Sequence, residues 1–443
     1  MKHNYTVREW NRIPYGEGKE QIPSFHADRL AALAQSSPLA GKGGSSVLEH
    51  GRHALRARGI VGILATKDCS LEILPKIDVL PGEGAEQQNA AIRKHLIHML
   101  AVARNLKLDI GAITDLAWQR ETLLEILVKI FCDKLTDAVR HGMPRRYVEQ
   151  QDDLPALRGR LDVVRQFTCH VVNVSRLACQ FDALSEDIAL NRVMKAVVRH
   201  LSITSRSSAN QQRLRELAFV YSDISDVPPS ALRWDQVVID RTNRRWHELL
   251  SMAQLFLDGR YQTTTGGAVQ GTALLFEMNS LFEEYVGRLI SRALAGTGAT
   301  VSLQGGRLFC LSAETTERGL FQTKPDILIR RAGKVTHVID TKWKRISSSI
   351  DDPKQGVSQS DVYQMMAYAH LYQAQRITLL YPHHRGLGDD ECVHARNQIT
   401  GRQTILETAS IDLANGHGML DRVRALLFAD EELVTHSDYA LSQ

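Results

Sequence analysis

Hydrophobic residues follow two different spacings along this chain, and the spacing changes with position. In the first eighty residues, apolar side chains gather in short runs at 59–64 and 70–77, separated by Lys67 and Asp68. Short apolar runs bounded by turn residues are typical of β-strands. Pro81, Gly82, Glu83 and Gly84 then interrupt the pattern. We therefore expect a β-rich N-terminal domain over residues 1–80.

A three-to-four spacing of apolar residues replaces these runs after the break. It covers residues 89–106 and 115–140, where one stripe consists of Leu123, Ile126, Leu127, Ile130 and Leu135. This period predicts amphipathic helices. Further helical pattern runs to Leu257, and Gly266-Gly267 marks a boundary. A mainly helical middle region over 81–265 is the expectation, with a short strand at 171–174.

Within this middle region, Arg158 and Arg160 flank Gly159. Two interpretations remain open for them. They contact a phosphate or a partner protein, or they form structural ion pairs with Asp182 or Asp187.

The last domain, residues 266–443, alternates helical and strand patterns. A helix is expected over 274–290, strands over 301–303 and 308–311, a β-hairpin over 327–339, a helix over 361–372, and strands over 377–381 and 404–411. Helix, three-stranded meander, helix and strand is an α/β order. The whole chain is therefore expected to combine α/β and α+β domains.

The hairpin carries the most informative polar residues. Arg331-Ala332-Gly333 fits a three-residue loop, in which Arg330 lies opposite Lys334. Strand alternation then puts Asp326 and Asp340 diagonally across from each other on one face. Lys342 lies on that same face. Two carboxylates and one ammonium group are thus expected at the open end of the hairpin.

This grouping predicts a cation site. Neighbouring carboxylates raise each other's pKa, so a cation is their natural partner. Hard oxygen ligands suit Mg²⁺, which keeps several waters and also binds phosphate. Asp326 and Asp340 are therefore the expected Mg²⁺ ligands, and Lys342 is expected to position a water or neutralise a phosphoryl oxygen. Pro-Asp followed by Asp-x-Lys resembles the PD-(D/E)xK nuclease motif.

Two other helices contribute candidates. Glu283 and Glu284 lie at the edge of the apolar stripe of the 274–290 helix, and Glu283 is the better candidate for a further metal ligand. A solvated glutamate is the alternative. On the helix over 361–372, Gln364 and Tyr368 are four residues apart and share one face.

Charge and composition narrow the function classes. Between Lys324 and Arg345 there are seven Lys or Arg and two Asp, a balance of 7 − 2 = +5. Such a basic rim suits a polyanionic substrate, and a solvated hairpin is the alternative interpretation. The P-loop spacing G-x-x-x-x-G-K-[ST] is absent from the sequence, so nucleotide hydrolysis through a P-loop is not expected. The six cysteines show no C-x-x-C motif. No apolar run approaches membrane-spanning length, and a cytoplasmic protein is expected.

Several stretches, taken in order, resemble one family: McrC, the nuclease subunit of modification-dependent, 5-methylcytosine-specific restriction systems. They are residues 71–77, 157–162, 179–191, 281–283, 325–326, 339–342 and 364–368. The resemblance implies a C-terminal domain of the PD-(D/E)xK restriction-endonuclease type and an N-terminal half that docks on a partner. That partner is a McrB-like AAA+ GTPase ring, and the substrate is double-stranded DNA carrying modified cytosine.

By the same resemblance, Gln364 and Tyr368 form the Q-x-x-x-Y face that supports the nuclease site. Two other functions remain open at this stage. One is a non-catalytic activator of a GTPase ring, and the other is a standalone DNA repair nuclease of the same fold. The complete set of Asp326, Asp340 and Lys342 favours a nuclease over an activator.

Overall fold

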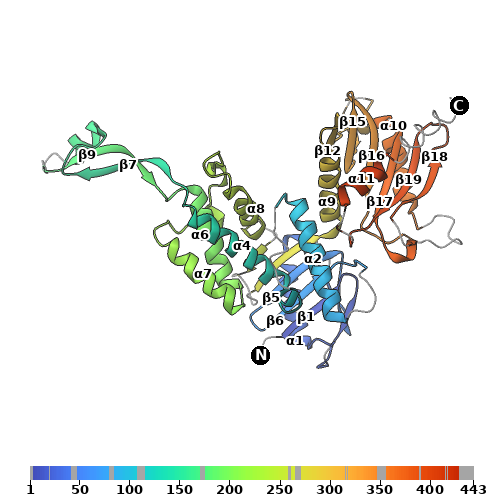
Figure 1. Cartoon of the computed structure of the whole chain (residues 1–443), viewed down its shortest axis with the longest axis horizontal. Helices are drawn as coiled ribbons and strands as arrows, with labels where there is room; N and C mark the ends of the chain where they lie inside the picture. Colours follow the sequence, from blue (N-terminus) through green and yellow to red (C-terminus); the bar gives the residue numbers. More distant parts are fainter. Residues whose placement is uncertain are drawn as a thin grey trace. The chain divides into compact units, whose positions relative to one another are not determined.

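The computed structural model describes residues 3–18, 20–40, 47–78, 84–106, 115–169, 175–257, 261–264, 271–314, 316, 318–346, 356–388, 391–414, 416 and 418–428. The chain forms two compact units (Figure 1). Unit 1 consists of Met1–Leu123 and Thr263–Gln443, and unit 2 is Leu124–Gln262. The expected domain border at Gly266-Gly267 lies outside the described residues. None of the described helices combines the length and apolar character that a membrane span requires.

The N-terminal part of unit 1 is built on a mixed sheet. Its strands in spatial order are β1 (His3–Arg8), β6 (Cys69–Leu74), β5 (Ile60–Thr66), β11 (Gly271–Glu277) and β10 (Tyr261–Thr264). The expected strands at 59–64 and 70–77 are β5 and β6, which pair antiparallel around the turn at Lys67 and Asp68. A smaller sheet orders β2 (Arg12–Pro14), β4 (Ala54–Ala57) and β3 (Leu48–His50).

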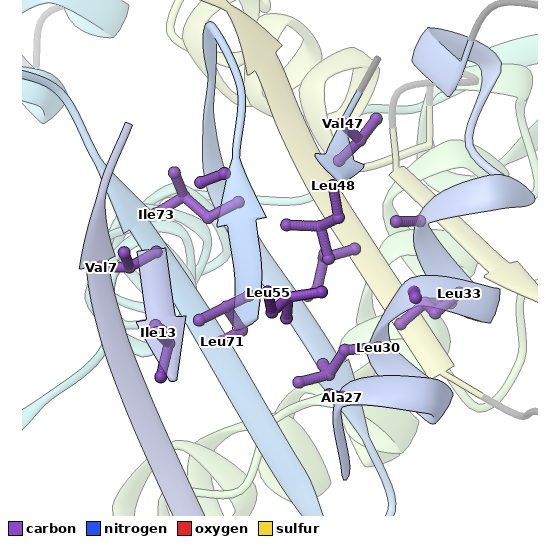
Figure 2. Packing of buried hydrophobic residues seen from close by; sticks show 14 of the residues in the cluster. Val7, Ile13, Ala27, Leu30, Leu33, Val47, Leu48, Leu55, Leu71 and Ile73 are labelled. Carbon is purple, nitrogen blue, oxygen red and sulfur yellow. The ribbon is translucent and has the colours of Figure 1, made fainter. Parts of the chain in front are cut away.

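One helix, which the sequence pattern did not predict, closes this core. Helix α1 (Ser24–Gln35) buries Leu30 and Leu33, and the turn η1 (Pro38–Ala40) follows it. Figure 2 shows these side chains in one cluster with Leu55, Leu71 and Ile73. The hydrophobic core of this part also includes Ala273 and Leu275 of β11.

Strand β11 corrects the helix expected over 274–290. Residues 271–277 are a strand paired antiparallel with β5, and the helix α9 begins only at Met278 (Met278–Ala293). The apolar run Ala273-Leu274-Leu275-Phe276 is buried on both faces. Such a run has no period that separates a buried strand from a buried helix. The N-terminal sheet thus takes a strand from beyond the expected border at residue 265.

Two helices pack beside this sheet, α2 (Ala85–Ala103) and the short α3 (Asp115–Arg120). A buried ion pair ties α2 to β6, since Arg93 Nη2 lies 2.8 Å from Glu72 Oε2. Arg93 Nη1 also donates to the carbonyl of Trp118 at 2.8 Å. Both charges are thereby compensated, which a buried charge requires.

Unit 2 is a helical bundle with a long ribbon. The helices are α4 (Leu123–Arg140), α6 (Ala189–Thr204), α7 (Ser208–Val220) and α8 (Trp246–Leu257), with short turns η3 (Pro229–Ala231) and η4 (Trp234–Gln236). These helices occupy part of the region expected to be mainly helical, while the residues before Leu124 belong to unit 1. At their centre, the buried carboxylate of Glu125 accepts hydrogen bonds from Ser205 Oγ at 2.7 Å and Asn210 Nδ2 at 2.8 Å.

The ribbon extends away from these helices (Figure 1). It is formed by β7 (Arg146–Leu154), β9 (Leu177–Ser185), the short β8 (Arg160–Leu161) and α5 (Val163–Cys169). We call residues 146–185 the arm. The sequence pattern missed β7 because its residues are mostly polar and exposed. The strand expected at 171–174 lies outside the described residues.

Arg158 and Arg160 both lie on the arm, and their contacts differ from the ion pairs considered from sequence. The guanidinium of Arg158 lies 4.1 Å from the ring centroid of Phe181. Arg160 Nη2 lies 3.5 Å from Glu149 Oε1. Asp187 instead pairs with Arg192 at 2.7 Å.

The C-terminal part of unit 1 is a second mixed sheet. Its strands in spatial order are β12 (Ala299–Leu303), β15 (Ile327–Arg331), β16 (Lys334–Thr341), β17 (Arg376–Pro382), β19 (Ile405–Ile411) and β18 (Val393–Gln398). β16, β17 and β19 run parallel. A separate hairpin of β13 (Phe309–Ser312) and β14 (Gly319–Gln322) precedes β15, and η5 (Arg385–Leu387) follows β17.

Helices cover both faces of this sheet. Helix α10 (Gln359–Tyr372) packs Met365 and Ala369 into a cluster with Val338 and Leu379. α9 and α11 (Met419–Phe428) pack on the opposite face, around Ile339. Because side chains alternate along a strand, Asp340 shares the α10 face with Val338.

The hairpin of β15 and β16 differs from its expected register. Its turn consists of Ala332 and Gly333, with φ of 48° and 79°, and Arg331 pairs with Lys334. A bulge next to Ile329 then shifts the ladder by one residue, so that Ile327 pairs with Ile339. Continued by one residue, this register brings Asp326 opposite Asp340 rather than diagonal to it. A bulge leaves no signature in the hydrophobic pattern, which is why the sequence did not reveal it.

Candidate active site

Two carboxylates meet where β15 begins and β16 ends. Asp340 is 1% exposed, and its Oδ2 lies 2.6 Å from Lys342 Nζ. Asp326 Oδ2 accepts hydrogen bonds from the backbone N of Thr341 at 2.7 Å and from its Oγ1 at 2.8 Å. The hairpin therefore holds Asp326, Asp340 and Lys342 together, as the sequence predicted.

Helix α10 supplies the neighbouring polar groups. Lys342 Nζ donates to Gln364 Oε1 at 3.3 Å. Gln364 Nε2 lies 3.5 Å from Asp340 Oδ1 and donates to the hydroxyl of Tyr368 at 2.8 Å. Gln364 thus reaches the hairpin and links its carboxylate to the helix, and Tyr368 on the same helix face binds Gln364.

Two further residues belong to this cluster and were not identified from sequence. Thr341 binds Asp326, as described above. Asp361 lies 3.9 Å from Lys342 Nζ and also pairs with Lys344. Its position three residues before Gln364 on α10 is the signal that was available, because residues three apart share a helix face.

Burial dominates the electrostatics of the acidic groups. It raises the pKa of Asp340 to about 6, with a further contribution from the charge of Asp326 and an opposing one from Lys342. Burial also raises the pKa of Asp326, although the hydrogen bonds from Thr341 lower it. For Lys342, burial favours the neutral amine, but the surrounding carboxylates outweigh it and its pKa is raised. The site thus holds more negative charge than Lys342 alone neutralises.

Glu283 on α9 lies beside these carboxylates. Burial, together with the charge of Asp326, raises its pKa to about 7. Its side chain is hydrogen-bonded to Gln304, whose backbone N donates to the carbonyl of Asp326 at 2.7 Å. Glu284 instead lies 3.6 Å from Arg104. Of the two glutamates, Glu283 is the one that the structure places next to Asp326.

The donor set suits a hard cation that keeps most of its own water. Among the described residues, no three His, Cys, Asp or Glu side chains lie close enough together to enclose an ion by themselves. Asp340 Oδ2 is buried against the ammonium group of Lys342, which lies 2.6 Å away. Mg²⁺ commonly binds through one or two carboxylates and several waters. Asp326 and Asp340 fit that mode.

Known proteins share the sequence pattern and the fold. A family model described as McrBC 5-methylcytosine restriction system component matches residues 55–382. The fold is similar to a chain of the half-complex from a tetradecameric assembly of Thermococcus gammatolerans McrB AAA+ hexamers with bound McrC. The TM-score is 0.68 at 20% identity, covering 95% of this chain and 98% of that chain.

A second structure, the Thermococcus gammatolerans McrBC complex, contains a chain with a TM-score of 0.50 at 23% identity. That match covers 66% of this chain and 88% of the other. No curated protein sequence matches the chain.

Proposed function

The chain belongs to the McrBC 5-methylcytosine restriction system component family, and we propose that it is the subunit of such a system that hydrolyses DNA phosphodiesters. The observation that carries this proposal is the convergence of Asp326, Asp340 and Lys342 with Gln364 at one end of the second sheet. A non-catalytic activator would have no use for a buried carboxylate pair beside a lysine.

In the proposed reaction, Asp326 and Asp340 would hold Mg²⁺, and Glu283, beside Asp326, is the candidate for a further ligand. The ion would polarise a phosphoryl oxygen and offset developing charge. Lys342, held by Asp340 and Gln364, orients the attacking water or neutralises a phosphoryl oxygen. Gln364 and Tyr368 keep Asp340 and Lys342 in position. These are the roles that the resemblance to the PD-(D/E)xK motif implies for the residues.

Basic side chains near the site suit DNA. The charge of Lys324 lowers the pKa of both Glu283 and Asp326, so it acts at the site. Lys344 and Arg345 follow Lys342 directly in sequence and are partly exposed. Cations around a phosphodiester site contribute affinity for the backbone that does not depend on sequence. Recognition of modified cytosine in the duplex is assigned to the partner.

Mg²⁺ is expected to stabilise the chain against heat more at pH 8 than at pH 5.5. The pKa values of Asp340 (about 6) and Glu283 (about 7) are raised, so protons compete with the ion at low pH. Without Mg²⁺, the stability of the chain is expected to fall rather than rise as the pH increases. A carboxyl whose pKa is raised on folding loses its stabilising contribution as pH rises from its unfolded toward its folded pKa.

Thermal unfolding with and without Mg²⁺ at both pH values measures this difference. Asp340→Asn should remove most of the Mg²⁺-dependent shift at pH 8. An equal shift at both pH values, or one that survives in Asp340→Asn, would contradict the assignment.

The proposed partner is a McrB-like AAA+ GTPase ring. One similar structure contains McrB AAA+ hexamers with bound McrC, and the other is the McrBC complex. The docking surface that we assign to this partner is in the N-terminal half and includes the arm. There, large apolar side chains are exposed, including Tyr147 (74%), Val164 (75%) and Phe167 (71%). Several large apolar side chains exposed on one part of a protein are typical of an interface.

The isolated chain is expected to hydrolyse neither GTP nor ATP and to cut DNA only weakly. It has no P-loop, so nucleotide turnover must come from the partner. Adding the ring with GTP should switch on Mg²⁺-dependent cleavage of DNA that carries modified cytosine. Phosphate release, measured with the purified chain before and after the ring is added, reports nucleotide hydrolysis. Robust hydrolysis by the chain alone would refute it, and cutting at full rate without the ring would favour a standalone nuclease.

A further inference from the structure

A buried carboxylate of the N-terminal sheet reaches the residue next to Lys342. Glu9 follows β1 directly, and its Oε1 accepts a hydrogen bond from the indole Nε1 of Trp343 at 2.6 Å. The same oxygen accepts from the backbone N of Lys76, just beyond β6, at 3.0 Å. Glu9 N in turn donates to the carbonyl of Leu74 at 2.9 Å. Glu9 is therefore anchored on its own sheet while it holds a tryptophan of the other one.

Trp343 is placed to transmit this contact to the site. Its ring packs edge-on against Phe282 with a centroid distance of 5.3 Å, and Phe282 precedes Glu283 on α9. Lys342 directly precedes Trp343, and its backbone N donates a hydrogen bond to the carbonyl of Leu380 at 2.9 Å. The indole thus packs on the helix that carries Glu283, and Trp343 directly follows Lys342 in the chain.

A second contact connects the same regions. Asp78, which follows β6, forms an ion pair with Arg345 and accepts a hydrogen bond from the backbone N of Arg385 at 3.3 Å. Residues 343 and 345 are therefore both tied to the end of the N-terminal sheet. The segment after β16 has contacts to that sheet immediately beyond Lys342.

If Glu9 served only the stability of the fold, a buried carboxylate would be an unfavourable side chain at this position. Glu9 is 1% exposed, and its Oε2 finds no hydrogen-bond partner among the described residues. Burial raises its pKa, against the hydrogen bonds from Lys76 and Trp343. A buried carboxylate with one unsatisfied oxygen is worse for folding than an apolar or neutral side chain of similar size.

We propose that Glu9 is a positioning residue of the nuclease site: by holding Trp343 it keeps Lys342 in place beside Asp340, and it makes this geometry depend on the N-terminal sheet. The inference rests on the proposed nuclease function. It also gives the N-terminal sheet a role in the chemistry, beyond docking. We call the pair Glu9 and Trp343 the clamp.

Three variants of the full chain test the clamp: Glu9→Ala, Trp343→Phe and the double variant. Trp343→Phe keeps an aromatic ring against Phe282 but removes the N–H donor. With the ring partner, GTP and modified DNA, each single variant should lower kcat about tenfold or more, since small displacements of catalytic groups have effects of this order. KM should change less than about twofold, because the clamp does not touch DNA. The double variant should lose no more than the worse single one, because both act through one contact.

Two controls separate positioning from general destabilisation. Glu9→Gln keeps an acceptor for the indole and should cut at a rate within about threefold of the original chain. Glu72→Gln changes another buried carboxylate of the same sheet, which binds Arg93 instead. It should lower the melting temperature without lowering the kcat of the folded protein.

The emission of Trp343 provides a readout that does not need cleavage. The difference spectrum between the original chain and Trp343→Phe isolates this indole, and Glu9→Ala should shift that spectrum. An unshifted spectrum, an unchanged kcat in Glu9→Ala, or losses that multiply in the double variant would each overturn the clamp. A shifted spectrum in a chain that never cuts DNA would support the contact and refute the proposed nuclease function.

Discussion

Replacing Asp340 by Asn should abolish Mg²⁺-dependent DNA cleavage, with a loss of about 100-fold or more. The substitution removes one negative ligand but keeps the size of a side chain that is 1% exposed. The pKa of Asp340 is raised to about 6, so the folded state already disfavours its charge. The melting temperature without metal should therefore stay the same or rise. The loss would then be chemical rather than structural.

Lys342→Ala should give a comparable loss, because it removes the cation that lies 2.6 Å from Asp340. Asp361→Asn is the matched control. It removes a neighbouring carboxylate that touches the same lysine at 3.9 Å but is not a proposed ligand. It should reduce cleavage much less than Asp340→Asn does. Cleavage is measured on plasmid DNA carrying modified cytosine, with the ring and GTP present. Cleavage at the original rate by either Asp340→Asn or Lys342→Ala would refute the site.

The N-terminal half by itself should bind the GTPase ring and raise its GTP turnover without cutting DNA. The proposed catalytic groups all lie from Glu283 onward. A fragment that stops at residue 265 would lack β11, which pairs with β5 in the N-terminal sheet. The fragment for this test therefore covers residues 1–277. GTP turnover by the ring, titrated with the fragment, measures the effect.

Substitutions on the arm of the full chain test the assigned docking surface more sharply. Val164→Asp and Phe167→Asp place charges on its exposed apolar side chains and should weaken the stimulation of GTP turnover about tenfold or more, as loss of an interface anchor does. Phe219 on α7 is equally exposed, at 81%, but lies outside the arm. Phe219→Asp should leave the stimulation unchanged. Stimulation that requires residues after 277, or that survives both arm variants, would show that the docking surface is elsewhere.

The sequence by itself determined which residues close in sequence lie on the same face of a hairpin or a helix. Asp326, Asp340 and Lys342 lie within seventeen residues of one another, on two strands joined by a tight turn. Strand alternation is enough to put such residues on one face. The same holds for Gln364 and Tyr368, which helical spacing places on one side of α10. Their predicted roles in metal binding and support remain proposals, but their proximity follows from short-range geometry.

Tertiary structure decided what depends on distant segments. The burial of β11 between two other strands made a strand of the first four residues of an expected helix, and a bulge in β16 changed which residues face each other. The contact between Glu9 and Trp343 joins residues 334 positions apart. No period or spacing in a sequence encodes such a pair, because it exists only once both sheets have folded and packed. For that reason the sequence located the candidate residues, and only the packing of unit 1 revealed the contact that we propose holds them in place.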